Sequence, residues 1–383
     1  MPSVWEQFRQ KMPICENYVY LDHAAISPLP APVTEAIQQW LVEAGERAGT
    51  IWGQWVRRVE KTRNLLAQLI GASAAEIALL PNTSVGIGMI AEGLPWKTGD
   101  SVVLLSNEFP SNQYPWWNLQ SRGVEIRSVP TDFAVDLDAV FSACDETTRV
   151  ISLSWVGYAS GWRVDIEQLV RRAHDSGIAV VLDAIQGLGV IPIDVNKVPI
   201  DFMAAGGHKW LMGPESAGML YIRKDRLDTL RPTGVGWKSV KKKYDYANID
   251  QDWIASAARF EGGTQNISGL IGLGASVATL LELGAGPDGS DVFDRILEVA
   301  DYACERIESA GGTVISDLAA EHRSSIISFE FPNSDSPNIQ KQLFKANVVI
   351  SQRAGRLRIS PHAYNNQDDI DRMVHEICRV IGS

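Results

Sequence analysis

A lysine and an aspartate each follow an apolar segment with the pattern of a buried parallel strand. Residues 201–205 are one such segment, and two glycines connect them to Lys209. Residues 178–182 are another and run into Asp183. The carboxyl ends of parallel strands meet at one edge of a sheet, and the glycines are expected to let the backbone turn sharply there, so both side chains should face one cleft. Pyridoxal phosphate needs this pair: a lysine holds its aldehyde as a Schiff base, and an acid keeps its pyridine nitrogen protonated.

The same two segments resemble a known family. Asp-Ala-Ile-Gln at 183–186 and Gly-His-Lys at 207–209 are similar to motifs of the fold-type I pyridoxal-phosphate enzymes of aminotransferase class V, in the branch of the cysteine desulfurases and isopenicillin N epimerase. The resemblance covers nearly the whole chain. It implies that Lys209 is the catalytic residue and that Gln186 and His208 contact the cofactor together with the aspartate.

The fold class expected is α/β. Seven segments read as strands, and helix-length connections between most of them predict a mostly parallel sheet with helices on both faces. The segment 216–223 follows the lysine too closely for a helical crossover and should run antiparallel. We expect an N-terminal arm (1–30) joining the small domain and the active site, a large cofactor-binding domain (31–283) and a small C-terminal α/β domain (284–383). The strand centres are Ala78, Val103, Ile126, Ile151, Val181, Met203 and Leu220.

A phosphate site is predicted where a strand near residues 76–80 runs into a helix. Thr83 or Ser84 would cap that helix, whose free N–H groups attract anions. The family carries its phosphate loop at this place. Relatives also have a phosphate-binding serine where this chain has Gly206, so His208 and Thr264 are the expected substitutes.

Two aromatic residues are expected beside the cofactor ring. Phe109 stands where the desulfurases have a histidine that covers the ring, and an aromatic side chain preserves stacking without an acid or base. Tyr158 stands where the family has an asparagine near the phenolic oxygen, and its hydroxyl is a possible replacement donor. A core position for Phe109 is the alternative.

Residues 20–30 resemble the family's N-terminal segment, whose small residues line the substrate site. His23 and Ala24 are therefore candidate substrate-binding residues. His23 replaces an asparagine of that pattern, and a buried hydrogen-bonding histidine is the alternative.

Residues 351–365 match the family's C-terminal pattern. Arg358 corresponds to an arginine that binds the substrate α-carboxylate, which a planar guanidinium contacts through two hydrogen bonds. Arg353 falls where a second substrate-facing arginine occurs in relatives. A solvated edge strand would show the same alternation of residues.

Residues 260–266 resemble a segment in which a threonine reaches the phosphate of the neighbouring subunit's cofactor. Thr264 takes that place here. The resemblance therefore implies a homodimer in which two chains complete each site.

One departure from the desulfurases concerns the nucleophile. Those enzymes attack sulfur with a cysteine on a loop just after the position of Arg353, and this chain has neither that cysteine nor room for the loop. We therefore expect an enzyme acting on an α-amino acid by removal of the α-proton, of aminotransferase or carbon–sulfur lyase type, and not a cysteine-persulfide desulfurase. Epimerisation of the isopenicillin N epimerase type is the alternative, and a non-catalytic binding protein is a further one that the presence of Lys209, Asp183 and Arg358 disfavours.

Composition excludes several other classes. The chain has 383 residues with a net charge of −11 and scattered acids, which argues against a nucleic-acid or membrane-surface partner. Its four cysteines form no CxxC pair, so neither a metal site nor a disulfide framework is indicated. With no apolar stretch long enough to span a membrane, a cytoplasmic location is expected.

Overall fold

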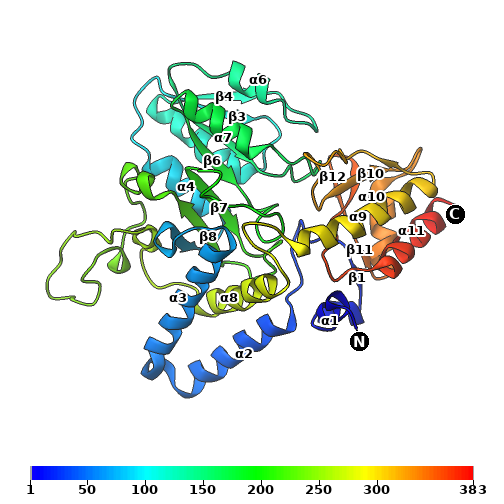
Figure 1. The fold of residues 1–383 in the computed structure, drawn as a ribbon, viewed down its shortest axis with the longest axis horizontal. Coiled ribbons are helices and arrows are strands. Elements are labelled where there is room, and N and C mark those ends of the chain that lie inside the picture. The colour runs from blue at the N-terminus through cyan, green and yellow to red at the C-terminus, as the bar shows by residue number, and fades with distance from the viewer. Residues whose placement is uncertain (1, 383) are drawn as a thin grey trace.

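Two bodies, each built around its own sheet, make up the fold, which is known from a computed structural model that describes residues 2–382. The larger body contains a seven-stranded sheet of order β2-β8-β7-β6-β5-β3-β4. The smaller contains a four-stranded sheet of order β12-β13-β10-β9. Figure 1 shows the larger sheet with its helices on one side of the molecule, and the smaller sheet with α9, α10 and α11 on the other.

The strands of the larger sheet cover all seven predicted strand centres. Pairing between β3, β4, β5, β6 and β7 is parallel, whereas β8 runs antiparallel to both β7 and β2. The mostly parallel sheet and the reversed strand are therefore confirmed. The strands are β2 (Ile77–Leu80), β3 (Ser101–Leu105), β4 (Glu125–Val129), β5 (Thr148–Ser154), β6 (Ala179–Asp183), β7 (Phe202–Gly206) and β8 (Gly218–Ile222).

Alternate strand residues enter separate hydrophobic cores on the two faces of this sheet. Val103 and Met203 belong to the core that contains α3, α7 and α8, and Val102 and Ala204 to the core that contains α4 and α5. Strand periodicity of two residues produces this division. The helices are α2 (Ala31–Glu46), α3 (Trp52–Leu69), α4 (Thr83–Gly93), α5 (Tyr114–Trp117), α6 (Leu137–Ser142), α7 (Ile166–Asp175) and α8 (Ile267–Glu282).

The smaller body has a third core, which includes Val19 and Leu21 from the N-terminal arm. Helix α9 packs its first turns against the larger body's core and its later turns, from Val299 onward, into this one. The elements are α9 (Asp291–Ser309), β9 (Thr313–Val314), β10 (Ile327–Glu330), α10 (Ser336–Lys345), β11 (Val348–Val349), β12 (Ser351–Arg353), β13 (Arg356–Ile359) and α11 (Gln367–Ile381).

The N-terminal arm connects the two bodies. After α1 (Val4–Gln10), strand β1 (Val19–Tyr20) pairs in parallel with β11 of the smaller body. A few residues later, the N–H of Ser27 donates to the carbonyl of His208 in the larger body at 2.8 Å. The arm is thus attached on both sides of the boundary.

His23 lies inside this attachment and is fully buried. Its Nδ1 lies 2.9 Å from the carbonyl oxygen of Ser360, and its Nε2 lies 2.9 Å from the hydroxyl of Tyr364. Burial lowers the pKa of His23 to about 4, and the pKa of the neighbouring, equally buried His362 is also lowered by burial. The imidazole of His23 is therefore a neutral part of the arm's packing.

Within residues 2–382, none of the helices has both the length and the apolar character that crossing a membrane requires.

We predict that His23 makes the protein less stable as the pH falls. The unfolded chain takes up a proton on this residue near pH 6.5 and the folded protein only near pH 4, so the free energy of unfolding should fall by about 3 kcal/mol across that interval. In the variant His23→Asn, the free energy of unfolding should lose this part of its dependence on pH. Urea unfolding at half-unit steps from pH 7.5 to pH 4 measures it.

The matched control is His375→Asn, at an exposed position on α11. Equal slopes for wild type, the His23 variant and the control would show that His23 does not contribute to acid sensitivity.

Candidate active site

A cavity of about 390 Å³ opens at the carboxyl ends of the parallel strands. This is the edge at which open α/β sheets bind ligands. Every residue that the sequence assigned to the site lines this cavity, except His23 and Thr264. The lining residues are Ala24, Ala25, Ile26, Asn82, Thr83, Ser84, Phe109, Ser111, Tyr158, Asp183, Ile185, Gln186, His208, Lys209, Arg353 and Arg358.

Lys209 and Asp183 meet here because β6 and β7 pair in parallel, with Asp183 beside Ala204. Burial raises the pKa of Asp183 to about 6, although the N–H of Ile185 and the charge of Lys209 oppose the rise. Burial lowers the pKa of Lys209 to about 8, and the nearby arginines lower it further. An amine with this pKa is partly unprotonated near neutral pH and serves as a nucleophile or a base.

The chain turns at residues 207 and 208, directly after β7, as expected, and the two glycines before Lys209 also serve close packing. Neither Gly206 nor Gly207 adopts the left-handed conformation. A Cβ on Gly207 would lie 2.6 Å from the carbonyl oxygen of Ala217 and 2.8 Å from Leu273. Only glycine therefore allows the lysine loop to approach β8 and α8 this closely.

An aromatic ring faces the cavity from the loop after β3. The side chain of Phe109 is 44% exposed, so it is not the core residue of the alternative interpretation. Tyr158 packs edge-on against it, with ring centroids 5.5 Å apart, and the Nζ of Lys209 lies 5.6 Å from the ring centroid. An open aromatic face beside the amine is suited to stacking a planar ligand.

A buried carboxyl group fixes the loop that carries Phe109. Glu108 accepts hydrogen bonds from both the N–H and the hydroxyl of Ser154 on β5. Burial raises the pKa of Glu108 to about 7. The sequence reasoning treated Glu108 only as the residue before the aromatic position, and its anchoring role depends on the β3–β5 pairing.

The start of α4 forms one end of the cavity, and its cap differs from the expectation. Asn82 is the N-cap and accepts a hydrogen bond from the N–H of Val85 at 2.9 Å, so neither Thr83 nor Ser84 caps the helix. The hydroxyl of Thr83 instead accepts from the N–H of Gly206, and the hydroxyl of Ser84 lies 2.7 Å from that of Ser111. Asn82 caps the helix from the position before it, so Thr83 and Ser84 both belong to the first helical turn. The other N–H groups of that turn are free to bind an anion.

His208 occupies the space that a side chain at position 206 would take. A Cβ on Gly206 would lie 3.1 Å from two atoms of the imidazole. Burial lowers the pKa of His208, and the charge of Lys209 lowers it further. The ring therefore lies directly beside position 206 and lines the same cavity as Thr83.

Gln186 and Ala24 join the arm to the cavity. The amide of Gln186 donates to the carbonyl of Ala24 at 3.1 Å and accepts from the indole N–H of Trp210 at 3.0 Å. Both residues line the cavity. His23 does not, because its ring turns away into the packing against the smaller body.

Both predicted arginines line the cavity from the smaller body. Arg358 is buried on β13, a central strand, and not on the solvated edge of the alternative interpretation. Arg353 ends β12, pairs with Arg356 across a tight hairpin and is half-buried. The cavity therefore has two guanidinium groups near its amine.

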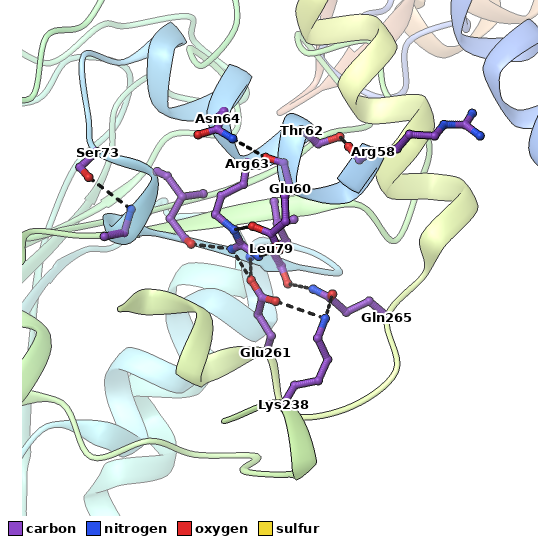
Figure 2. Close-up of polar contacts among 12 residues, drawn as sticks. Arg58, Glu60, Thr62, Arg63, Asn64, Ser73, Leu79, Lys238, Glu261 and Gln265 are labelled. Carbon is purple, nitrogen blue, oxygen red and sulfur yellow. Dashed lines mark hydrogen bonds and ion pairs between the residues drawn. The ribbon is translucent and has the colours of Figure 1, made fainter. Parts of the chain in front are cut away.

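Thr264 is exposed and lies outside the cavity lining. Figure 2 shows how its neighbours are held: Glu261 contacts Arg63 and Lys238 and accepts from the N–H of Leu79 at 3.0 Å. Gln265 donates to the carbonyl of Leu79 at 3.1 Å. The segment on either side of Thr264 is thus fixed to β2 while the threonine itself faces outward.

Several lining residues were not predicted. Asn82 was identifiable as a capping residue in the sequence Asn-Thr-Ser, which starts α4. Ser111 and Ile185 follow strands in the way that the assigned residues do. Ala25 and Ile26 extend the small-residue segment of the arm, and no local signal distinguishes them from Ala24.

The cavity's groups fit pyridoxal phosphate. An amine of lowered pKa suits the aldehyde, a buried carboxylate suits the pyridine nitrogen, and an open aromatic face suits the ring. The first turn of α4 suits the phosphate.

Comparison with known proteins agrees with this geometry. The sequence model of aminotransferase class V matches residues 19–373. The chain is 30% identical to a probable cysteine desulfurase of Methanothermobacter thermautotrophicus, over 98% of each chain, and 25% identical to isopenicillin N epimerase of Streptomyces clavuligerus, over 99% of this chain and 98% of that one. An apo cysteine desulfurase from Thermococcus onnurineus superposes with a TM-score of 0.88 at 24% identity, covering 100% of this chain and 99% of the other.

That solved structure supports the fold, which is the fold-type I architecture expected. The family match extends from the arm to α11 and includes both bodies and every cavity residue. The chain therefore belongs to the aminotransferase class V family.

Proposed function

We propose that the protein is a pyridoxal-phosphate-dependent enzyme that removes the α-proton of an amino acid, using Lys209 as its base. The observation that carries this proposal is the position of Lys209. Its amine has a pKa of about 8 and lies at the strand ends with Asp183, Phe109 and Arg358 around it. When bound, pyridoxal phosphate supplies an electron-accepting ring that stabilises negative charge at the substrate's α-carbon.

The cofactor's groups have separate partners in the cavity. Asp183 would hold a proton at the pyridine nitrogen, and Phe109 would cover the ring. Thr83, Ser84 and His208 would bind the phosphate at the start of α4. Gln186 and Tyr158 would donate hydrogen bonds to the phenolic oxygen.

The substrate's groups are bound by the smaller body and the arm. Arg358 holds the α-carboxylate, which orients the α-hydrogen toward Lys209. Arg353 and Ala24 line the same cavity. Lys209 then takes the proton, which its lowered pKa permits near neutral pH.

Persulfide chemistry is not part of the proposal, although relatives are named cysteine desulfurases. The hairpin between Arg353 and Arg356 has only Ala354 and Gly355 at its turn. No cysteine lines the described cavity. Burial also raises the pKa of the thiols of Cys15 and Cys304, to about 11 and about 12, which makes them poor nucleophiles.

We also propose a homodimer in which Thr264 reaches the cofactor phosphate of the partner subunit. The ion-pair cluster in Figure 2 supports this, because it fixes the backbone around Thr264 and leaves the hydroxyl outside the chain's own cavity. The exposed side chains of the preceding loop, including Tyr246 and Ile249, offer apolar surface for a second copy.

A cytoplasmic location is the remaining part of the proposal. The four cysteines are free thiols, as is usual in a reducing compartment.

The variant Lys209→Ala should fold and bind the cofactor without a covalent bond. Borohydride reduction followed by mass spectrometry should find the cofactor on Lys209 in the wild type and on no lysine in the variant. Turnover should fall at least about 100-fold, because the base is lost. Lys242→Ala, on an exposed loop, is the control, and normal turnover by the Lys209 variant would contradict the proposal.

Product analysis should identify the reaction type. The cofactor-loaded protein is incubated with L-cystine or L-alanine in deuterated water, without a keto acid. Repeated formation of pyruvate and ammonia from cystine alone indicates β-elimination. One equivalent of pyruvate per site from alanine, with pyridoxamine phosphate, indicates an aminotransferase, and the D-isomer indicates an epimerase. Failure to exchange the α-hydrogen of any amino acid in a broad panel would contradict α-proton removal.

The shared site should be visible in mixed dimers. Thr264→Ala should weaken cofactor retention about tenfold, the effect of one hydrogen bond to a charged group. At a cofactor concentration too low to saturate the Thr264→Ala protein, a heterodimer of Thr264→Ala with Lys209→Ala should regain about half of the wild-type activity, because one site then combines an intact lysine with the partner's threonine. Activity no higher than that of either parent would mean that Thr264 acts within its own subunit or not at all.

A further inference from the structure

The α-carboxylate arginine has an acidic partner that the sequence reasoning did not identify. Asp22, in the N-terminal arm, lies with one carboxylate oxygen 2.9 Å from the Nη2 of Arg358. Both side chains are almost completely buried, 1% exposed for the arginine and 11% for the aspartate. The positive charge of Arg358 is therefore compensated before any substrate arrives.

A serine closes this pair into a ring. The Nε of Arg358 donates to the hydroxyl of Ser351 at 3.0 Å, and that hydroxyl donates to the same oxygen of Asp22 at 2.8 Å. The Nη1 of Arg358 donates to the carbonyl of Tyr158 in the larger body at 2.6 Å. These contacts use three of the five N–H groups and leave one on each terminal nitrogen, which is the number that a carboxylate needs for two hydrogen bonds.

The backbone holds Asp22 in place. The backbone N–H of Leu21 donates to the carbonyl of Val349 at 2.9 Å, and the backbone N–H of His23 donates to the carbonyl of Ser360 at 3.2 Å. Asp22 is thus fixed between two segments of the smaller body and stays beside the guanidinium.

Within the described part of the chain, Arg353, the second guanidinium of the cavity, lacks the carboxylate partner that Arg358 has. Among residues 2–382, no carboxylate forms an ion pair with Arg353, whose guanidinium donates to the carbonyl of Gln352. The field of Asp22 also acts on Lys209 and raises its pKa, opposite to the effect of the two arginines. An incoming anion therefore meets a compensated guanidinium at Arg358 and an uncompensated one at Arg353.

We propose that Asp22 is a positioning residue that weakens carboxylate binding at Arg358. Recognition of the substrate then depends on the geometry of its hydrogen bonds to Arg358 and on its second contact, at Lys209, more than on charge. The inference rests on the proposed role of Arg358 as the carboxylate site. A small anion without an amino group should then bind poorly, while an amino acid placed at Lys209 binds productively. Removal of the negative charge of Asp22 should make the site bind carboxylates more tightly and discriminate less between amino acids and small anions.

The test is the variant Asp22→Asn, in which an amide oxygen accepts the same two hydrogen bonds without the negative charge. Acetate is titrated into the cofactor-loaded protein and followed by the cofactor's absorbance. We expect the Kd for acetate to fall about tenfold, and the KM for the amino-acid substrate to fall with it while kcat does not rise.

Two controls separate charge from structure. Ser351→Ala breaks the ring without changing charge and should weaken acetate binding. Arg358→Gln should abolish it. If Arg358→Gln binds acetate as the wild type does, the carboxylate role of Arg358 fails and the inference fails with it.

If Arg358→Gln does abolish binding but Asp22→Asn binds acetate no more tightly than the wild type, the proposed function stands and the role of Asp22 is overturned. Circular dichroism establishes that each variant is folded. Asp22→Ser, a second neutral side chain able to accept a hydrogen bond, replaces the asparagine variant if that one does not fold, with the same expected outcome.

Discussion

The parallel pairing of β6 with β7 is the constraint on which the site depends. It fixes the end of one strand, with Asp183, beside the end of the next, from which Lys209 follows. Hydrophobic cores cover both faces of the sheet up to this edge, and Asp183 is only 2% exposed. Burial therefore moves the two pKa values toward each other, upward for the acid and downward for the amine.

The remaining groups reach the cavity through their place in the sheet order. β5 and β3 follow β6 in the sheet, so the loops after them bring Tyr158 and Phe109 to the same edge. The smaller body adds its arginines from β12 and β13. The contact between Arg358 and the carbonyl of Tyr158 ties the two bodies together at the point where a substrate would bind, so the cavity's shape depends on their packing.

The sequence was sufficient for the sheet and for most of the cavity, for identifiable reasons. Buried parallel strands are short apolar runs, and the connection after Lys209 was too short for a crossover, which made the reversal of β8 predictable. Asp183 was predictable because it ends such a strand, whereas Phe109, Tyr158 and the two arginines were assigned from the resemblance to the family.

Other features depend on contacts between segments distant in the chain, which local patterns do not encode. The anchoring of Glu108 requires the β3–β5 pairing, and the burial of His23 requires the smaller body. The pairing of Asp22 with Arg358 joins positions 336 residues apart. Gly207 was noticed as a turn residue, but only the position of Ala217 explains why glycine is needed there. Thr264 is exposed and lies outside the cavity of its own chain, and the contact proposed for it requires a second chain.

The parallel pairing of β1 with β11 has a consequence for synthesis of the protein. Val19 pairs with Val348. The N-terminal strand is therefore synthesised early but has no pairing partner until translation is nearly complete. The larger body's sheet has all its strands before residue 223 and is able to form while the ribosome is still working, because its contacts are closer in sequence. The wall of the cavity that carries Arg353 and Arg358 belongs to the last tenth of the chain. A prematurely terminated chain would thus contain Lys209 and the start of α4 without the two arginines that complete the cavity.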